Sequence, residues 1–405
     1  MILKTLPANK YCNQVTDGTH DSPKQTSEGK YLITSKHLSR YNINFQDAYK
    51  ISIEDYDKII FRSRVDQYDI LYSMIGTIGN IYQEMLPFQQ IDYAVKNVGI
   101  FKCDNYYRSK WLYYYLQSPE AVEYITSNLK GSTQKYISLG ELRNMPIKYV
   151  DNDKLQTRIV DVLVSHDNKI RANIEHINIL EQIVKQTYQN WFNNYNYPNA
   201  TDELVFNNQL EREIPSDWDV VPSQRFLTPT SEKIGDTTAP IYSTTNNGIA
   251  LRDEKFNKNL TKLQGNNKKV VKDDLIFGLS REILNFGVFA DEIGSVSPAY
   301  QIFKINQNVI LPFMLELEMR INMPRYMDIL QLGAREGQGI RKDYLMRKYF
   351  LVPKMELQEE FFKLYDVLQR KISKLKEENE VLAEIRDTLL PKLMSGELPV
   401  KVGEE

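Results

Sequence analysis

Residues that commonly bind metals or act as nucleophiles are scarce in this sequence, which has four histidines and two cysteines among 405 residues. Cys12 and Cys103 are too few for a structural zinc site or a disulfide framework, and unpaired cysteines are typical of a reducing cytosol. His20 lies in the segment DGTHDSP, between Asp17 and Asp21. Metal binding is one interpretation, but a polar turn explains the Asp-Gly and Ser-Pro pairs equally well. We therefore predict no metal site and no bound cofactor.

Motifs for phosphate binding and methyl transfer are incomplete. Gly29 and Lys30 are followed by Tyr31, where a Walker A motif needs Ser or Thr, and the upstream glycine is missing. Methyl transfer to a base amino group requires an Asn/Asp/Ser-Pro-Pro-aromatic motif, and the segment SPAY at Ser297–Tyr300 lacks the second proline. No nucleophile, base and orienting group can be assigned together. We therefore do not expect the chain to be a catalyst.

Residues suited to nucleic-acid binding are more numerous. Between positions 252 and 272 seven Lys and Arg residues stand against two carboxylates, with Asn and Gln interleaved. Lys and Arg neutralise phosphates, while Asn, Gln and Arg can read base edges. A solvated loop is the alternative interpretation of this run. Residues of the same types in the first 150 positions are comparable candidates. Together, the candidate DNA-binding residues are Lys36, Arg40, Gln134, Lys135, Arg252, Lys255, Lys258, Lys262, Lys268 and Lys269.

Length and composition predict a globular chain of several domains. At 405 residues, with 42% hydrophobic and 26% charged residues, two to four domains are expected. The formal net charge of −2 excludes a protein that is basic all over, although a local basic face is possible. No apolar run approaches the roughly 18–20 residues of a membrane span, and the segment after Met1 lacks a signal-peptide core. We therefore expect a cytoplasmic protein without a membrane partner.

An internal repeat dominates the organisation of the chain. Two helical stretches, 155–192 and 357–394, superpose without a gap at a constant offset of 202 residues, which pairs Leu155 with Leu357 and Ile183 with Ile385. Apolar residues in each recur at steps of three and four, a spacing that packs helix on helix. At about 1.5 Å per residue, each helix would be roughly 57 Å long. The exact repeat favours pairing of the two helices with each other.

The segments between the helices have a different character. Residues 1–150 and about 205–352 are rich in Tyr, Asn, Gly and Thr, with short β-like runs and turn signals. Within them, 69–79 echoes 274–283, and 131–137 echoes 334–340. We predict an α+β protein with two mixed α/β domains, separated by two long antiparallel coiled-coil helices. The predicted parts are a first domain at 1–150, a helix at 151–195, a linker at 196–213, a second domain at 214–352, and a second helix with the C-terminal segment at 353–405.

With this repeat, the chain resembles the specificity subunits of type I restriction–modification enzymes over essentially its whole length. The segments that carry the resemblance are DGTHDSP with YLITSKHL at the opening of a target-recognition domain, GSTQKYI, LRNMPI and LQTRIVDVL at its exit, IPSDWDVVP at the start of a second domain, and RDTLLPKLMSGELPV near the C-terminus. The last is the most specific. Two features depart from the pattern: the first domain lacks an IPSDW-like start, and the second has no clear DGTH counterpart.

The resemblance implies a non-catalytic reader of double-stranded DNA. Each globular domain would recognise one half of a bipartite sequence, and the paired helices would act as a ruler between them. Family members recruit two methyltransferase subunits, which bring S-adenosylmethionine, and ATP-driven restriction subunits. On the segments that match, the resemblance adds Thr19, His20, Arg335 and Gln338 to the candidate DNA-binding residues.

Three alternatives remain open on the sequence. The chain could serve a methyltransferase-only complex without a restriction subunit. It could be an enzyme with a divergent methyltransferase or nuclease site, for which SPAY is the only support. It could also be an adaptor whose repeat only holds other proteins, in which case no sequence-dependent DNA binding is expected.

Overall fold

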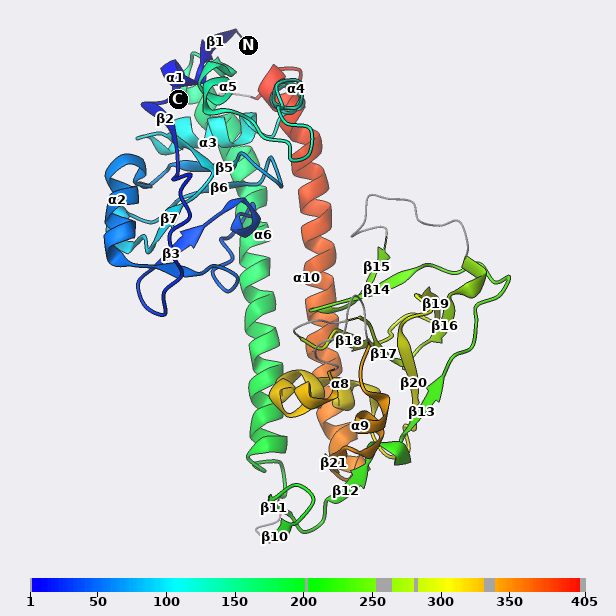
Figure 1. Cartoon of the computed structure of the whole chain (residues 1–405). Helices are drawn as coiled ribbons and strands as arrows, with labels where there is room; N and C mark the ends of the chain where they lie inside the picture. Colours follow the sequence, from blue (N-terminus) through cyan, green and yellow to red (C-terminus); the bar gives the residue numbers. More distant parts are fainter. Residues whose placement is uncertain (1, 201–202, 253–263, 280–282, 331–338, 401–405) are drawn as a thin grey trace. The chain divides into compact units, whose positions relative to one another are not determined.

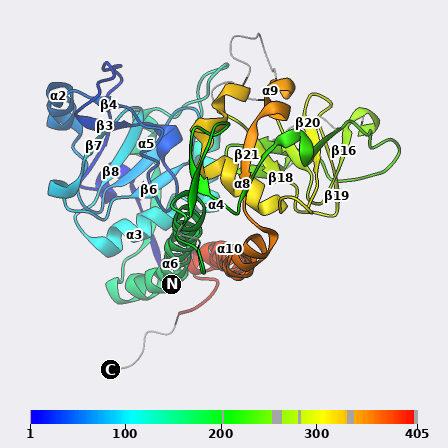
Figure 2. The same cartoon turned by 90° about the horizontal axis from the view of Figure 1, so that it is seen from below.

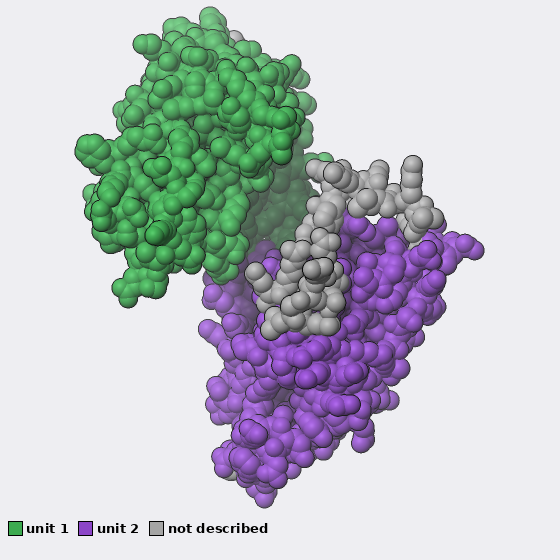
Figure 3. Space-filling view, in the orientation of Figure 1, with its two compact units in different colours: residues 1–176, 374–405 green, residues 177–373 purple. Residues whose placement is uncertain are grey.

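The computed structural model of the chain describes residues 2–200, 203–252, 264–279, 283–330 and 339–400. It contains two compact units, coloured separately in Figure 3. Unit 1 is formed by residues 1–176 and 374–405, and unit 2 by residues 177–373. The division falls inside the two long helices, α6 (Asp153–Tyr188) and α10 (Met355–Ser395), so each unit contains one globular part and a portion of both helices. The predicted domain borders stay predictions.

Unit 1 is built around an antiparallel four-stranded sheet of order β2-β8-β5-β6. A second sheet, β4-β3-β7, is covered by α2, whose Tyr56 and Ile59 pack on Leu32, Ile51 and Ala94 (Figures 1 and 2). The elements of the globular part are β1 (Leu3–Pro7), α1 (Ala8–Tyr11), β2 (Gln14–Asp17), β3 (Lys30–Ile33), η1 (Ser35–His37), β4 (Lys50–Ile51), α2 (Ile53–Ser63), β5 (Ile70–Ser73), β6 (Ile81–Gln83), η2 (Phe88–Gln90), β7 (Tyr93–Val95), β8 (Val98–Lys102), α3 (Tyr106–Tyr115), α4 (Pro119–Ser127), α5 (Leu139–Asn144) and β9 (Pro146–Val150).

Unit 2 repeats this plan with an antiparallel sheet of order β13-β20-β17-β18. The pair β12-β21 likewise repeats the pair β1-β9 of unit 1. The elements are η3 (Gln189–Asn193), β10 (Leu204–Asn207), β11 (Arg212–Pro215), β12 (Asp219–Pro222), η4 (Ser223–Arg225), β13 (Leu227–Thr230), β14 (Tyr242–Thr245), β15 (Gly248–Leu251), η5 (Gln264–Asn266), β16 (Lys268–Val271), β17 (Leu275–Phe277), β18 (Phe286–Val288), β19 (Ile293–Val296), β20 (Gln301–Ile305), α8 (Pro312–Ile321), η6 (Met323–Ile329), α9 (Lys342–Arg347) and β21 (Tyr349–Val352).

The repeat extends to single hydrogen bonds inside the globular parts. Asp69 and Asp274 are buried directly before the equivalent strands β5 and β17. The Oδ2 of Asp69 accepts the N–H of Asp66 at 2.8 Å, and the Oδ2 of Asp274 accepts the N–H of Val271 at 2.9 Å. The residue before each aspartate has a φ of 70°. Burial raises the pKa of both carboxyl groups, that of Asp69 to about 6. The faint sequence echo of 69–79 with 274–283 therefore reflects the same fold.

The two predicted helices are present. The apolar seam of α6 is buried, whereas that of α10 is buried at Ile372 and only partly buried at Leu375, Leu382 and Leu389. Ile170, Ile177, Leu180 and Val184 of α6 are each 9% exposed or less. The first helix ends as an α-helix at Tyr188 and continues through one π-helical turn, Gln189–Asn193. Both helices have an amphipathic pattern without helix-breaking residues until Pro391, near the end of α10.

Within unit 1, the parts of α6 and α10 run antiparallel. Contacts that lie further toward the C-terminus of α6 lie further toward the N-terminus of α10. Asp167 accepts a hydrogen bond from Arg386, and Asn173 donates to Asn379 at 2.9 Å. Asn173 is fully buried on the seam. These contacts confirm the predicted antiparallel helix pair.

The ends of the helices belong to the cores of the globular parts. Leu390, Leu393 and Met394 of α10 pack in the same cluster as Trp111 in unit 1. Tyr188 and Phe192 pack in the main cluster of unit 2. Hydrophobic burial thus joins each helix end to its domain. Among the described residues, no helix has both the length and the apolar character needed to cross a bilayer.

Candidate nucleic-acid interface

Four strand ends meet at one edge of the main sheet in unit 1. Because the sheet is antiparallel, the ends of β2 and β5 lie beside the starts of β8 and β6: Asp17 pairs with Gly99, Ser73 with Val98. The connections that leave this edge are residues 18–20, 74–80 and 96–97. Together with η1 and the hairpin 130–136, they form what we call the loop edge of unit 1.

The DGTH segment is held at this edge by close backbone packing. A Cβ at Gly18 would lie 2.1 Å from the carbonyl oxygen of Val95, so only glycine fits there. His20 is exposed, with Nε2 3.0 Å from Asp17 Oδ2 and Nδ1 2.8 Å from Asn97 Oδ1. Thr19 is 7% exposed, and its Oγ1 accepts the N–H of Asp21 at 3.1 Å. The segment therefore presents His20 outward, while Thr19 shapes the turn.

A polar hairpin stands next to the DGTH segment. Lys130 and Tyr136 pair as a β-bridge, with Gly131 at a φ of 90°, and Tyr136 also bridges to Ile75. The tip residues Gln134 and Lys135 are exposed. A Cβ at Gly76 would be 3.8 Å from Gln134 Nε2, so the tip lies over the 74–80 connection. An exposed Gln and Lys on a rigid turn can hydrogen-bond to base edges and to phosphates.

Two asparagines connect these loops to η1. Asn80 Nδ2 donates to the Ser35 carbonyl at 3.2 Å, and Ser35 Oγ donates to the Asn97 carbonyl at 3.4 Å. The N–H of Asn97 in turn donates to the Thr19 carbonyl at 3.1 Å. Lys36, next to Ser35, is exposed. The structure therefore brings Thr19, His20, Lys36, Gln134 and Lys135 to one edge, although they are far apart in the sequence.

Arg40 lies away from this edge. Its guanidinium faces the helix pair, with Nη1 3.3 Å from Asp387 Oδ1 and Nε 3.9 Å from Asp167 Oδ1. Its side chain is only 21% exposed. DNA contact by Arg40 stays a prediction, and the contacts seen are with α6 and α10.

Unit 2 has an equivalent loop edge. The ends of β13 and β17 and the starts of β18 and β20 meet there, with Phe277 paired to both Phe286 and Gln301. The side chain of Gln301 donates to the Ile340 carbonyl at 2.8 Å, so the segment after residue 338 joins this edge.

The predicted residues of unit 2 are only partly described. Lys255, Lys258, Lys262, Arg335 and Gln338 lie outside the described residues.

The described cations of the basic run have contacts inside unit 2. Lys268 Nζ donates to the Tyr300 carbonyl at 2.5 Å, and burial lowers its pKa. Lys269 Nζ pairs with Glu232 Oε1 at 2.9 Å. Arg252 is half-buried at the end of β15. DNA contact by these three stays a prediction, and only part of each side chain is open to a ligand.

Sequence reasoning missed three residues at the loop edge of unit 1. Asn80 and Asn97 connect its loops, and Arg62 of α2 donates from Nη2 to the Gly18 carbonyl at 2.6 Å. Asn97 has a φ of 55°, a conformation that asparagine tolerates well. A polar Lys-Asn pair between two apolar runs was the available turn signal for Asn97. Nothing in the sequence identified Arg62, because its contact spans 44 residues.

The DGTH and SPAY segments, considered above for metal binding and methyl transfer, form turns with local hydrogen bonds. No group of three or more His, Cys, Asp or Glu among them could hold a metal ion. The SPAY segment forms a turn in which the Tyr300 N–H donates to the Ser297 carbonyl at 3.0 Å. His20 Nε2 lies near Asp17 Oδ2, and the other ring nitrogen of His20 contacts the side-chain oxygen of Asn97.

Comparison with known proteins gives a consistent assignment. Residues 18–184 match the family described as type I restriction modification DNA specificity domain. The chain is 25% identical over 319 residues to the type I restriction enzyme MjaIX specificity subunit of Methanocaldococcus jannaschii, covering 72% of this chain and 70% of that protein. The crystal structure of the S subunit of a type I restriction–modification system from M. genitalium has the same fold, with a TM-score of 0.51, 15% identity, and coverage of 97% of this chain and 96% of that one. Over residues 18–184 this chain is therefore similar to the DNA specificity domain of type I restriction–modification enzymes, and over most of its length it is similar to a specificity subunit of such an enzyme.

Proposed function

We propose that each globular part reads one half of a bipartite double-stranded DNA sequence through its loop edge. The observation that carries this proposal is the duplication of the edge: two sheets of the same strand order each bring four strand ends together. A single chain with two equivalent reading edges suits a target with two separate half-sites. In unit 1 the reading residues are His20, Lys36, Gln134 and Lys135, which are exposed on that edge.

The paired helices set the distance between the half-sites. Each is a continuous element, of 36 residues for α6 and 41 for α10, and a helix rises about 1.5 Å per residue. At that rise the helices are about 54 and 62 Å long, which exceeds one helical turn of DNA, about 34–36 Å, the separation expected for the half-site centres.

The helices also carry a duplicated apolar surface that is suited to a partner present in two copies. Ile179 and Ile183 of α6 are 53% and 39% exposed. Their repeat equivalents on α10, Val381 and Ile385, are 55% and 41% exposed. Exposed apolar residues kept at the same positions in both halves indicate the same binding surface twice. We assign these surfaces to two methyltransferase subunits.

In this proposal the chain itself is a non-catalytic, cytoplasmic subunit. S-adenosylmethionine and ATP would be bound by its methyltransferase and restriction partners. A complex with methyltransferase alone uses the same two reading edges and the same helix surfaces. Purification of the complex from the source cells would show whether a restriction subunit is part of it.

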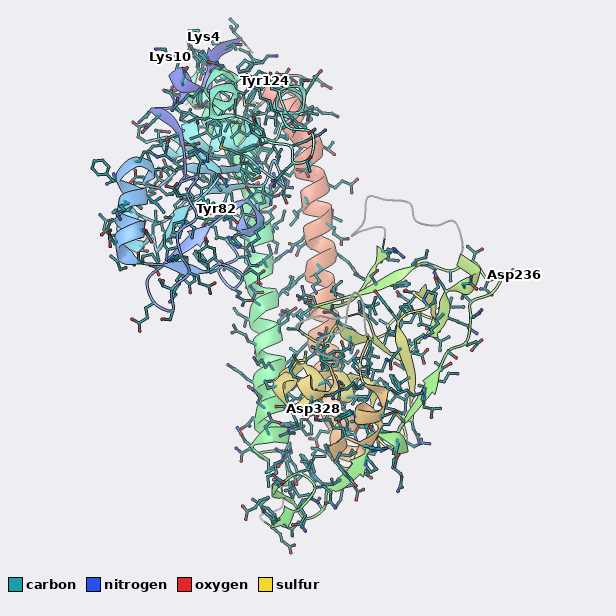
Figure 4. All side chains as sticks on the ribbon, viewed as in Figure 1. Lys4, Lys10, Tyr82, Tyr124, Asp236 and Asp328 are labelled. Carbon is teal, nitrogen blue, oxygen red and sulfur yellow. The ribbon has the colours of Figure 1, made fainter. Side chains whose placement is uncertain are left out.

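Methylation mapping of DNA tests the reading function. The chain is combined with its methyltransferase, and the methylated sequence is read from a genome with and without this gene. We expect one asymmetric, gapped motif to depend on the gene. Replacing Gln134 and Lys135 together by Ala should change or relax one half-site and leave the other intact. Lys10→Ala is the matched control, because Lys10 (Figure 4) is an exposed residue of α1 near the opposite end of β2. If the double variant still recognises both half-sites unchanged, the assignment of the loop edge as the reading surface is wrong.

Native mass spectrometry tests the helix surfaces. Ile183→Glu and Ile385→Glu should each remove one methyltransferase copy, and the double variant should remove both. Asn178→Glu adds the same charge to an exposed position on another face of α6 and should keep two copies. Two copies retained in the double variant would reject this surface.

A further inference from the structure

The seam between α6 and α10 contains two buried polar pairs within unit 1. Asn173 of α6 is fully buried, and its Nδ2 donates to Asn379 Oδ1 of α10 at 2.9 Å. Asp167 of α6 and Arg386 of α10 are 4% and 3% exposed, and Arg386 Nη1 donates to Asp167 Oδ1 at 2.7 Å. Each pair takes one residue from each helix. We call Asn173–Asn379 and Asp167–Arg386 the two polar pairs.

The apolar residues of the seam do not distinguish the two helices. At the offset of 202 residues, Ile170 corresponds to Ile372, and Leu180 corresponds to Leu382. In the register that the polar pairs set, Ile170 comes opposite Leu382. Two copies of α6 in the same register would place Ile170 of one copy opposite Leu180 of the other. The apolar seam of α6 is therefore as complementary to a second α6 as to α10.

The polar pairs break this equivalence. In the repeat, each of their members corresponds to a residue of different chemistry: Asn379 to Ile177, Arg386 to Val184, Asn173 to Leu375 and Asp167 to Gln369. Pairing of two copies of α6 would therefore place Asn173 opposite Ile177, and Asp167 opposite Val184. Pairing of two copies of α10 would likewise leave the guanidinium without a carboxylate.

Both self-pairings are costly, because buried polar groups would lose their partners. A buried amide or charge without a partner does not recover the solvation that it had in water. Asp167 would keep the hydroxyl groups of Tyr114 and Tyr41, which donate to it at 2.7 and 3.1 Å, but it would lose its counter-ion. A polar residue at one seam position is a known means by which helix pairs select partner and register.

The order of synthesis gives this selection a purpose. The chain is made from its N-terminus, and α10 follows α6 by 202 residues. At about 5–20 residues per second, the apolar seam of α6 is complete roughly 10–40 s before its partner exists. During that time the α6 of another growing chain is an available apolar surface. We propose that the two polar pairs select the α6–α10 pair of one chain and exclude pairing of either helix with its own copy in a second chain.

This selection goes beyond the proposed reading of DNA and does not depend on it. A dimer paired through two copies of α6 would join two first globular parts. In the proposed function such a dimer would read one half-site twice. The polar pairs keep the two different globular parts of one chain together.

Co-expression of two differently tagged copies of the full chain, without methyltransferase, tests the selection. Copurification counts the mixed dimers, and a short amine-reactive cross-linker with mass spectrometry shows which helices pair. Two paired copies of α6 bring Lys169 of one copy near Lys185 of the other, whereas within one helix these lysines are about 24 Å apart. An α6–α10 pair instead links Lys169 to Lys374, because Lys169 Nζ lies 3.4 Å from Glu378 Oε1, one turn further along α10.

Two single variants separate selection from simple weakening of the helix pair. Asn173→Leu and Asn379→Ile break the same hydrogen bond, but the first alone makes the α6 seam apolar at this position. Asn173→Leu should raise Lys169–Lys185 cross-links between copies at least about tenfold, because a buried unpaired amide no longer opposes the pairing of two α6 helices. Asn379→Ile should stay at the wild-type level, because Asn173 is kept. Asn178→Leu, the same change at an exposed position of α6, should also stay there.

Equal cross-linking in the wild type and Asn173→Leu would overturn the proposal. Equal increases in Asn173→Leu and Asn379→Ile would also overturn it, because they would reflect a weaker helix pair and no selection. Mixed dimers of Asn173→Leu that are linked between copies through Lys169 and Lys374 alone would show an exchange of helices between chains, which contradicts the proposal as well. Since no arm contains DNA, a failure of the proposed reading function leaves these results unaffected.

Discussion

The buried ion pair between Asp167 and Arg386 allows a stability prediction in unit 1. Arg386 is 3% exposed, and its Nη1 lies 2.7 Å from Asp167 Oδ1. Replacing Arg386 by Met keeps most of the aliphatic volume and removes the charge. Removing one partner of a buried pair costs about 3–5 kcal/mol. Because Tyr114 and Tyr41 still donate to Asp167, the lower value, about 3 kcal/mol, is expected.

For a unit of this size, about 1 kcal/mol moves the melting temperature by roughly 2–4 °C, so the variant should melt about 6–12 °C lower. Circular dichroism during heating measures this. Arg370→Met is the matched control on the same helix, since the Arg370–Asp366 pair is exposed and such pairs contribute at most about 0.5 kcal/mol. Equal melting temperatures for the two variants would refute the reasoning.

The same ion pair should respond to acid. Burial alone would raise the pKa of Asp167, but the charge of Arg40 and the hydrogen bonds from Tyr114 and Arg386 hold it below its usual range. A lowered carboxyl pKa contributes stability that is complete above the unfolded pKa, near 4, and is lost as the pH falls through the folded pKa. The difference in melting temperature between the wild type and Arg386→Met should therefore become smaller as the pH falls through the folded pKa of Asp167.

Three further predictions concern the helices and the buried lysine. Inserting four residues after Ile177 should lengthen α6 by about 6 Å and change the unread spacer of the DNA target, with both half-sites kept; methylation mapping that finds the old spacer would contradict the ruler function. The stability of the wild type should rise between about pH 8 and 10, because the unfolded chain keeps a proton on Lys110 that the folded chain releases, and urea unfolding of Lys110→Met should lack this rise. Gln358→Leu should destabilise unit 2 by about 2–3 kcal/mol in the same assay, since the side chain accepts from Leu311 N–H at 2.9 Å and donates to two carbonyls; a change under about 0.5 kcal/mol would show those bonds to be unimportant.

Part of the candidate site could be predicted from local sequence. The DGTH segment and the hairpin around Gly131 are turns whose residue types are set by neighbouring backbone, as the close approach of Gly18 to Val95 shows. His20, Gln134 and Lys135 are indeed exposed on those turns. A count of charges in the sequence could not predict that Lys268 and Lys269 have partners within the protein. Lys268 donates to the Tyr300 carbonyl and Lys269 pairs with Glu232, and both partners are more than thirty residues away in the sequence.

The sequence by itself determined the duplicated plan and the two long helices. Helical periodicity is local, and the offset of 202 residues is visible without any fold, so Ile170 and Ile372 could be assigned to buried seams before their partners were known. Only the tertiary structure decided which loops share an edge, because strand order depends on packing between distant segments. It also decided that Arg40 turns toward Asp167 and Asp387. Long-range burial and charge pairing are properties of the assembled chain, and no local pattern encodes them.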